Sequence, residues 1–190
     1  MAKIISEDLT NNKLCVLLYT TTNRQMLSIK PDSFDAKMVA HTYTDIGRIV
    51  FGTPITKIHD YAFYDCSILT SIIIPDNVTT IGEGAFEECK NLTSVIIGDS
   101  VTTIGFGAFY VCKSLSRITI GKNVQKIGMK AFQGCSNIDT IICRATTPPK
   151  LYISSDSTTS SFKKFETLVV PTGCEEAYAN SDWGYYLKEQ

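Results

Sequence analysis

Residues 55–146 repeat one pattern four times with a period of 23 residues. The four rows, 55–77, 78–100, 101–123 and 124–146, align without a gap. Every row has a β-branched residue at position 1, Ile at position 4, Ala-Phe at positions 8 and 9, Cys at position 12 and a β-branched residue at position 18. A unit of this size is too small to bury its own apolar side. The period therefore predicts a solenoid, in which stacked repeats share one core.

Each repeat contains two stretches that we interpret as strands. Positions 15–23 follow the pattern L-x-x-L-x-L-x-x-N, with Ile or Val in place of several leucines. Positions 15, 18 and 20 should point into the core, and positions 17 and 19 should point out. Positions 1–4 form a second, shorter extended stretch. The Ala-Phe-x-x-Cys stretch between them spaces its apolar residues as one helical turn does.

Three columns of side chains follow from this alignment. At position 9 we expect buried rings, and at position 23 we expect polar side chains that hydrogen-bond the backbone at the bend. The rings are Phe63, Phe86, Phe109 and Phe132. The polar residues are Asn77, Ser100, Asn123 and Thr146. Position 12 carries Cys66, Cys89, Cys112 and Cys135.

The cysteine column is interpreted as a row of small buried hydrophobic groups. Its members lie one repeat apart, which is not the spacing of a zinc site. The chain has 7 cysteines, so a complete set of intramolecular disulfides is impossible. Redox sensing is the alternative, and it would require exposed thiols with a lowered pKa.

Residues 1–54 do not fit the repeat and are expected to form an N-terminal cap, because the end of a solenoid exposes core edges. The segment LCVLLYTTTNRQMLSIK predicts a hairpin around the turn 21–25. A short helical or irregular piece should follow at 32–38, and 45–51 reads as a strand.

Residues 147–190 are expected to form the C-terminal cap, in one structural domain with the repeats. Pro148-Pro149 ends the periodicity, and 154–161 reads as a polar loop. We expect a last strand at 166–170, a turn at 171–173 and a short helix at 175–180. An aromatic lid should close the final repeat with Trp183, Tyr185, Tyr186 and Leu187. A ligand platform is the alternative role for Trp183.

The repeats resemble those of the BspA-like leucine-rich repeat surface proteins of oral and gut bacteria. The motif I-G-x-x-A-F-x-x-C-x-x-L-x-x-I-x-I stands at 81–97 and 104–120, and it varies in the other two rows, where His59 replaces the first glycine of the pattern in the first row. The segments 19–58 and 168–173 also resemble the ends of such proteins. The resemblance implies a right-handed, β-rich leucine-rich repeat solenoid with two caps. It also implies a secreted or cell-surface, adhesin-like role toward a protein partner.

The sequence offers little support for catalysis, metal binding or nucleic-acid binding. The net charge of −1 gives no electrostatic reason to expect nucleic acid, and no apolar run is long enough to cross a membrane. His41 and His59 lie outside any nucleophile or paired-carboxylate motif. Asp76 and Asp99 share position 22 with Lys122, which argues against calcium. We therefore expect no enzyme activity, no cofactor and no metal.

The candidate binding site is the outward face of the positions 15–23 strands. Because neighbouring strands lie about 4.8 Å apart, positions 17 and 19 should form one contiguous patch. Its residues are Ser71, Ile73, Ser94, Ile96, Arg117, Thr119, Thr140 and Ile142. Stacking of sheet-forming side chains is the alternative reading. The predicted function is a monomeric, non-catalytic protein-interaction module, adhesin-like at the cell surface. An intracellular adaptor of the same fold is the alternative, favoured by the free thiols and by the lack of a recognisable leader.

Overall fold

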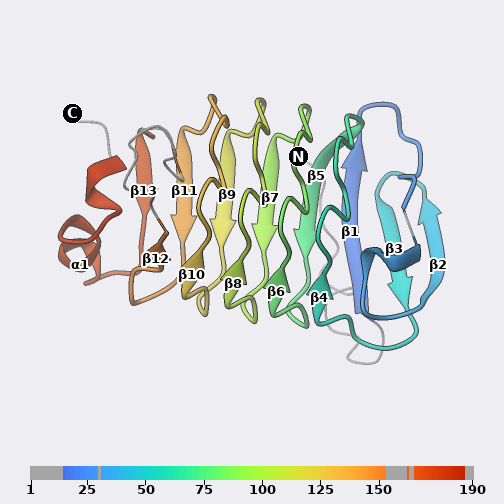
Figure 1. Cartoon of the computed structure of the whole chain (residues 1–190), viewed down its shortest axis with the longest axis horizontal. Coiled ribbons are helices and arrows are strands. Elements are labelled where there is room, and N and C mark those ends of the chain that lie inside the picture. Colours follow the sequence, from blue (N-terminus) through green and yellow to red (C-terminus); the bar gives the residue numbers. More distant parts are fainter. Residues whose placement is uncertain (1–14, 30, 153–161, 163–164, 187–190) are drawn as a thin grey trace.

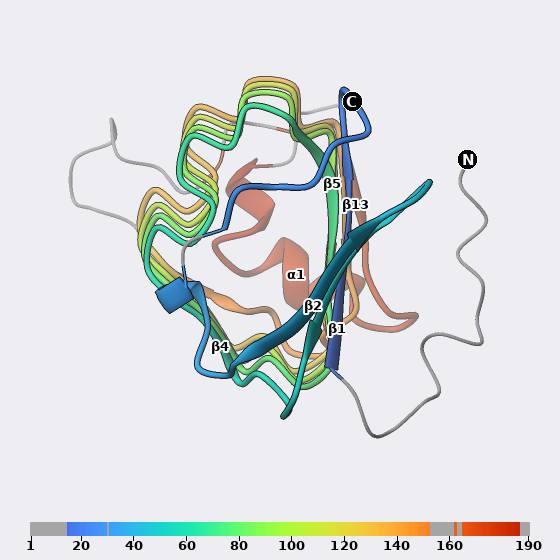
Figure 2. The same cartoon turned by 90° about the vertical axis from the view of Figure 1, so that its right-hand side faces the viewer.

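The computed structural model describes residues 15–29, 31–152, 162 and 165–186, which form an elongated stack of strands (Figure 1). We call each repeat, one turn of the stack, a rung. Viewed end-on, the four rungs superimpose as nested outlines (Figure 2). Two sheets run along the stack within the described residues. The large sheet has the strand order β13-β11-β9-β7-β5-β1-β3-β2, and the small sheet has the order β12-β10-β8-β6-β4.

The repeats supply one strand to each sheet, as the sequence predicts. Strands in the large sheet come from positions 15–20: β5 (Leu69–Ile74), β7 (Ser94–Ile97), β9 (Arg117–Ile120) and β11 (Thr140–Cys143). Strands in the small sheet come from positions 3 and 4: β4 (Lys57–Ile58), β6 (Thr80–Ile81), β8 (Thr103–Ile104) and β10 (Lys126–Ile127). All these neighbours pair in parallel, one rung apart.

The Ala-Phe-x-x-Cys stretch forms hydrogen-bonded turns and no continuous helix. Within a rung, the Cys89 N–H donates to the Phe86 carbonyl at 3.3 Å. The Phe86 N–H itself donates to the Ala108 carbonyl of the next rung at 2.7 Å. Because part of the backbone is used between rungs, the stretch cannot complete the i→i−4 pattern of an α-helix.

The N-terminal cap differs from the hairpin predicted for 14–30. β1 (Cys15–Thr21) is antiparallel to β5 on one side and to β3 (Gly47–Phe51) on the other. With both edges of β1 occupied, the residues after the 21–25 turn find no edge to pair with. β3 confirms the strand predicted at 45–51. The expected helical piece at 32–38 is only the short 3-10 helix η2 (Pro31–Ser33).

The outermost strand of the large sheet, β2 (Met38–Tyr43), is absent from the sequence-based prediction. It pairs only with β3, and its residues are mostly exposed, so they carry no burial pattern. Apolar alternation, the usual strand signal, arises from one buried face. An exposed edge strand lacks that signal.

The C-terminal cap closes the other end of the stack. β12 (Lys150–Leu151) extends the small sheet, and β13 (Thr167–Val169) confirms the predicted last strand. The short α1 (Glu175–Ala179) and the 3-10 helix η4 (Gly184–Tyr186) lie across the end of the stack (Figures 1 and 2). Leu187 and the loop 154–161 lie outside the described residues.

Trp183 is part of the lid and not a ligand platform. Its side chain is fully buried, and its indole Nε1–H donates to the Pro149 carbonyl at 2.8 Å. Tyr178 is also buried, and its hydroxyl donates to the Ala145 carbonyl at 2.8 Å. A buried ring whose polar atom is satisfied by backbone packs as core and leaves nothing for a ligand.

The phenylalanine column at position 9 is stacked through the core. Its three consecutive ring pairs have centroids 4.9, 5.0 and 5.1 Å apart and nearly parallel planes. Phe162 extends the stack beyond Phe132 at 4.7 Å. Phe34 meets Phe63 edge-on at 5.8 Å. Each cap therefore places its own phenylalanine on an end of the column.

The cysteine column combines packing with hydrogen bonding. Cys89, Cys112 and Cys135 are fully buried, as predicted, but Cys66 in the first rung is only half-buried. Each buried thiol lies 3.1 Å from the carbonyl of the phenylalanine one rung earlier and donates to it. Desolvation raises the pKa of the Cys89 thiol far above its usual range. Burial also raises the pKa of the Cys112 thiol, so Cys89 and Cys112 lack the acidity that redox sensing requires.

We expect thiol-labelling reagents to react with the half-buried cysteines before the fully buried ones. Cys66 and Cys174 are half-buried and should react first in the native state. Cys112 should react only after unfolding, because both its burial and its raised pKa suppress the thiolate. Mass spectrometry of partially labelled protein, with and without denaturant, measures the order. Native labelling of Cys112 as fast as that of Cys66 would contradict it.

The bends are held by position 22, one residue before the expected column. The Asp76 carboxylate accepts the Asp99 N–H at 2.7 Å, and the Asp99 carboxylate accepts the Lys122 N–H at 3.1 Å. Asp99 also forms ion pairs with Lys122 and Arg144 at 3.8 and 3.7 Å. These aspartates therefore tie successive rungs together.

Position 11 has a left-handed backbone in every rung, and this conformation strains Val111. Its φ is +59°, close to +52° for Asp65 and +60° for Glu88, whereas the fourth rung uses Gly134 at +80°. A β-branched residue is unfavourable in this region, and asparagine tolerates it. We expect Val111→Asn to raise the free energy of unfolding by about 1 kcal/mol. Chemical denaturation checks this, with Val111→Ala as the control that removes the branch but not the strain.

Candidate binding face

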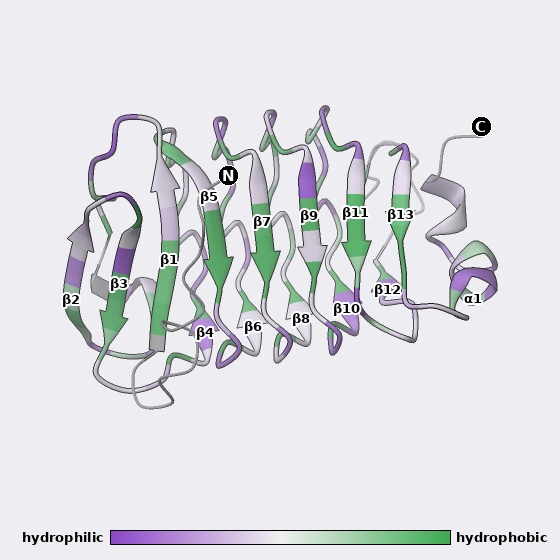
Figure 3. Cartoon of the chain, turned by 180° about the vertical axis from the view of Figure 1, so that it is seen from behind, coloured by the Kyte–Doolittle hydropathy of each residue, from purple (hydrophilic) through white to green (hydrophobic). Residues whose placement is uncertain are grey.

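The outer face of the large sheet brings together all eight residues predicted for the binding site. Parallel pairing places the position 17 residues in one row across four strands and the position 19 residues in a second row. The first row is Ser71, Ser94, Arg117 and Thr140. The second row is Ile73, Ile96, Thr119 and Ile142. Figure 3 shows this face with hydrophobic segments in β5, β7 and β11 and a hydrophilic segment at the start of β9.

The two rows differ from an open apolar stripe. Arg117 is exposed, but the three isoleucines are only half-exposed, and Thr119 is 8% exposed. The prediction that Thr119 is available to a partner is therefore wrong. It lies between Ile96 and Ile142 on the neighbouring strands, and its side chain is shorter than theirs.

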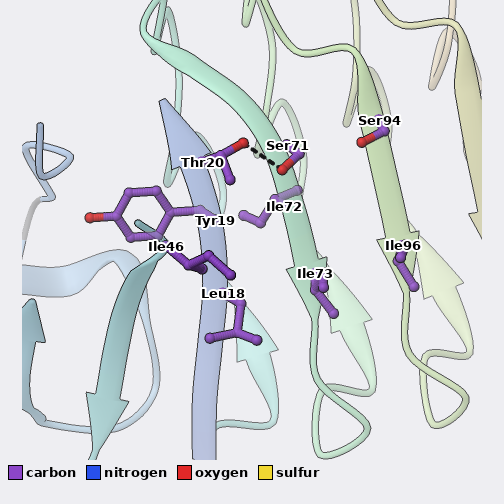
Figure 4. A pocket seen from close by; sticks show the side chains of 9 residues that line it. All are labelled: Leu18, Tyr19, Thr20, Ile46, Ser71, Ile72, Ile73, Ser94 and Ile96. Atoms are coloured by element: carbon purple, nitrogen blue, oxygen red, sulfur yellow. Dashed lines mark hydrogen bonds between the residues drawn. The ribbon is translucent and has the colours of Figure 1, made fainter. Parts of the chain in front are cut away.

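A hollow of about 190 Å³ opens at the N-terminal end of this face (Figure 4). Four residues of the predicted site line it: Ser71, Ile73, Ser94 and Ile96. The cap adds Leu18 and Thr20 from β1, and Ile46 from the turn before β3. Arg117, Thr119, Thr140 and Ile142 continue the face beyond the hollow. None of the described residues that line it is charged, so the hollow favours an uncharged group.

Hydroxyl groups gather on one side of the hollow. Thr20 Oγ1 lies 2.6 Å from both the Thr70 and the Ser71 hydroxyl oxygens, and these groups hydrogen-bond to one another. Figure 4 shows Thr20 and Ser71 meeting between β1 and β5, with Ser94 on the next strand. The pairing of β1 with β5 shifts register between Thr20 and Thr21. A partner could therefore find apolar contact and hydroxyl hydrogen bonds side by side.

The sequence analysis missed the cap residues of the hollow. The predicted hairpin paired β1 with residues that follow it, whereas β1 adds to β5. The period identifies residues that recur in each rung, and Leu18, Thr20 and Ile46 occur outside it. The alternation of VLLYT across β1 was the available signal, since it places Leu18 and Thr20 on one face.

Tyr19 holds the cap side of the hollow in place. Its ring is buried, and a side chain at Gly47 would collide with it. The Tyr19 hydroxyl accepts the Leu27 N–H at 3.3 Å and lies 2.6 Å from His41 Nε2, to which it can donate. Burial raises the pKa of Tyr19 and lowers that of His41. His41 therefore anchors β2 to β1, a structural role.

The described residues include both histidines and most of the acidic side chains, which could act as metal ligands. They contain no group of three or more His, Cys, Asp or Glu side chains placed to hold a metal ion. His59 Nδ1 is hydrogen-bonded to the Asp32 backbone carbonyl at 2.8 Å, away from the hollow. Within the described ranges, no helix has the length and hydrophobicity needed to cross a bilayer.

Comparison with solved structures finds bacterial leucine-rich repeat proteins. A protein from Bacteroides capillosus ATCC 29799 is 32% identical, over 49% of this chain and 66% of its own, with a TM-score of 0.45. A leucine rich cell surface protein from Faecalibacterium prausnitzii A2-165 is 27% identical, over 81% and 42%, with a TM-score of 0.49. The T. pallidum leucine rich repeat protein is 21% identical, over 62% and 64%, with a TM-score of 0.41. The matches thus span less than two thirds of each of these proteins.

A search of the curated proteins finds no match. The model of the BspA type leucine rich repeat region matches residues 36–157 in six copies, which extend beyond both ends of the four aligned rows. Proteins with this repeat and fold are typically non-catalytic interaction modules. The match covers more than half of the sequence and includes all four rungs of the stack. The chain therefore belongs to the BspA-type leucine-rich repeat family.

Proposed function

We propose that the chain binds a protein partner through the outer face of its large sheet, in an adhesin-like role at the cell surface. The observation that carries the proposal is the uncharged hollow between β1, β5 and β7. It combines the apolar side chains of Ile73 and Ile96 with the hydroxyls of Thr20 and Ser71. An apolar hollow with a few convergent polar groups is the usual form of a recognition site.

The partner should insert one apolar side chain into the hollow and lie along the strands toward β9. A cavity of about 150 Å³ lined by aliphatic groups accommodates a benzene ring, so this hollow has room for a side chain of similar size. Arg117 lies on β9, directly beside the lining residue Ser94 of β7, and it is exposed, with no ion pair among the described residues. Arginine is enriched at protein interfaces, where it offers directional donors to a carboxylate or carbonyl.

The test is a double substitution on this face. Ile96→Asp with Arg117→Glu places a charge in the hollow and reverses the charge beside it. Both side chains point away from the core, so the fold should persist. Binding to a partner found among host extracellular-matrix proteins should fall by about 100-fold or more, a loss that corresponds to about 2.7 kcal/mol.

A matched control carries the same charge changes on the small sheet. Thr103→Asp with Lys126→Glu alters solvent-facing side chains of β8 and β10. This variant should bind as the parent does. If the Ile96/Arg117 variant folds and keeps the parental affinity, the large-sheet face is only scaffold.

An intracellular adaptor is the second candidate. The six cysteines whose side chains the structure describes are all free thiols, which suits a reducing compartment. Binding assays against host extracellular-matrix proteins and against the source cell's own lysate separate the two roles. A hollow-dependent partner found only in the lysate favours the adaptor.

A further inference from the structure

A second surface lies on the turns that connect small-sheet strands to large-sheet strands, on the side away from the large sheet (Figure 2). We call it the aromatic flank. It consists of side chains from positions 6, 7 and 10 of the first three rungs: Tyr61, Tyr64, Glu83, Glu87, Phe106 and Tyr110. Tyr61, Tyr64 and Phe106 are 42%, 50% and 44% exposed, among the largest exposed apolar groups of the described chain.

Stacking of the rungs puts two carboxylates among four rings. At position 10, Glu87 lies in the rung between those of Tyr64 and Tyr110. At position 6, Glu83 lies in the rung next to that of Phe106. Backbone hydrogen bonds fix this alignment, since the Glu88 N–H donates to the Tyr110 carbonyl at 2.8 Å. The carboxylates and rings are therefore neighbours by the register of the solenoid.

Tyr61 stands at the centre of the flank. Its ring covers Gly84, where an added Cβ would collide with the ring and lie 2.9 Å from Glu87 Oε2. Its hydroxyl donates to Glu83 Oε1 at 2.7 Å. Its ring meets that of Tyr64 edge-on, with centroids 6.1 Å apart. Tyr61 thus hydrogen-bonds Glu83, meets the ring of Tyr64 and lies near Glu87.

At position 7 the backbone favours glycine, yet two of the four rungs carry a larger residue there. At position 7 the φ angles are +57° for Tyr61, +53° for Gly84, +56° for Gly107 and +61° for Lys130. A non-glycine residue is strained in this region, and such strain is often found at functional positions. The two strained residues are Tyr61, which supplies a ring of the flank, and Lys130, which supplies a cation.

The Lys130 ammonium group lies over one ring of the flank, that of Phe106. Lys130 Nζ lies 5.8 Å from the centroid of the Phe106 ring, within the range of a cation–π interaction. The rings of this surface are therefore placed so that an ammonium group can approach a ring face from solvent.

The flank also carries negative charge that the described residues do not neutralise. Lys57 pairs with Asp60 at 3.7 Å, and Lys90 pairs with Glu88 at 2.9 Å and with Asp65 at 3.9 Å. Glu83 and Glu87 have no such partner among the described residues. Burial, with repulsion from Glu88 and Glu83, raises the pKa of Glu87. A cation placed between Glu83 and Glu87 would relieve this repulsion.

We infer that the aromatic flank binds a lysine or arginine side chain of a protein partner, held between the Glu83 and Glu87 carboxylates and the exposed rings of Tyr61, Tyr64 and Phe106. Rings supply cation–π attraction and carboxylates supply charge-assisted hydrogen bonds, so the two act on the same group. The inference is independent of the proposed function, because the flank and the hollow are on different sides of the stack.

The test is a titration of the full chain with tetra-arginine amide, followed by the NMR signals of isotope-labelled tyrosine rings at about 150 mM salt. Signals of Tyr61, Tyr64 and Tyr110 should shift, and that of the distant Tyr185 should not. Two double variants remove the two components: Glu83→Gln with Glu87→Gln, and Tyr64→Ala with Phe106→Ala. Each should weaken binding by about tenfold or more.

Controls separate a specific site from general attraction. Glu175→Gln with Glu176→Gln removes the same charge from exposed residues of α1 and should leave the affinity within about twofold of the parent. An equal loss in this control, or no shift in the parent, would overturn the inference. So would a ring variant that folds and binds normally.

Maltotetraose tests the rival ligand class. Shifts with this sugar but not with tetra-arginine would overturn the inference and assign the flank to carbohydrate. Thermal melting verifies the fold, and if the ring variant fails to fold, the charge variant decides.

Discussion

Replacing Phe109 with alanine is expected to lower the free energy of unfolding by about 3–5 kcal/mol. The ring is fully buried and stacked between Phe86 and Phe132, with centroids 5.0 and 5.1 Å away. Its loss opens a cavity in the middle of the column, where the neighbouring rungs are held by backbone hydrogen bonds and cannot collapse. Chemical denaturation of the variant measures the change.

Phe106 offers a matched control for this prediction. It is the same residue type, three positions earlier in the same rung, and it is 44% exposed. Phe106→Ala removes the same atoms but opens no interior cavity, so it should cost less than about 1 kcal/mol. Equal effects of the two substitutions would show that the position 9 column is not the centre of the core.

Removing residues 168–190 should make the protein form larger oligomers or aggregates than the parent chain does. The deletion removes most of β13 and with it the pairing partner of β11, so that a row of unpaired N–H and C=O groups is exposed. It also removes Trp183, Tyr178 and Tyr186, which are at most 2% exposed. Size-exclusion chromatography with light scattering measures the outcome.

The control for the truncation is Tyr185→Ala, which removes a ring that is 72% exposed from the same cap. That variant should keep the oligomeric state of the parent, with a melting temperature close to that of the parent. A truncated chain that keeps the parental oligomeric state and melts as the parent does would contradict the capping role of the segment.

The repeating part of the fold was predictable because each rung has the same residue types at the same core positions. Phe86, Phe109 and Phe132 are equivalent in sequence and in space, so the period reports the core directly. The caps have no such redundancy. β2 is exposed and lacks an apolar pattern. β1 pairs with β5 across about fifty residues of sequence, a distance over which local patterns carry no information.

The candidate site was predictable only in part, for the same reason. Ile73 and Ile96 follow from the outward positions of the repeat. The hollow also needs Ile46 and the β1 side chains, which come from the cap. The aromatic flank escaped prediction because its members, Tyr61, Glu87 and Phe106, are the variable residues of their columns. A search for conserved periodicity passes over such positions.

The uniform contact between rungs makes the length of this molecule adjustable in fixed steps. A duplicate of residues 101–123 inserted after Asn123 would meet neighbours with the same phenylalanine, thiol and backbone pairings on both sides. It would lengthen the stack by one strand spacing, about 4.8 Å. The hollow is built from the first two rungs and the N-terminal cap, so it would be unchanged. The number of repeats thus sets the distance from the hollow to the C-terminal end of the stack.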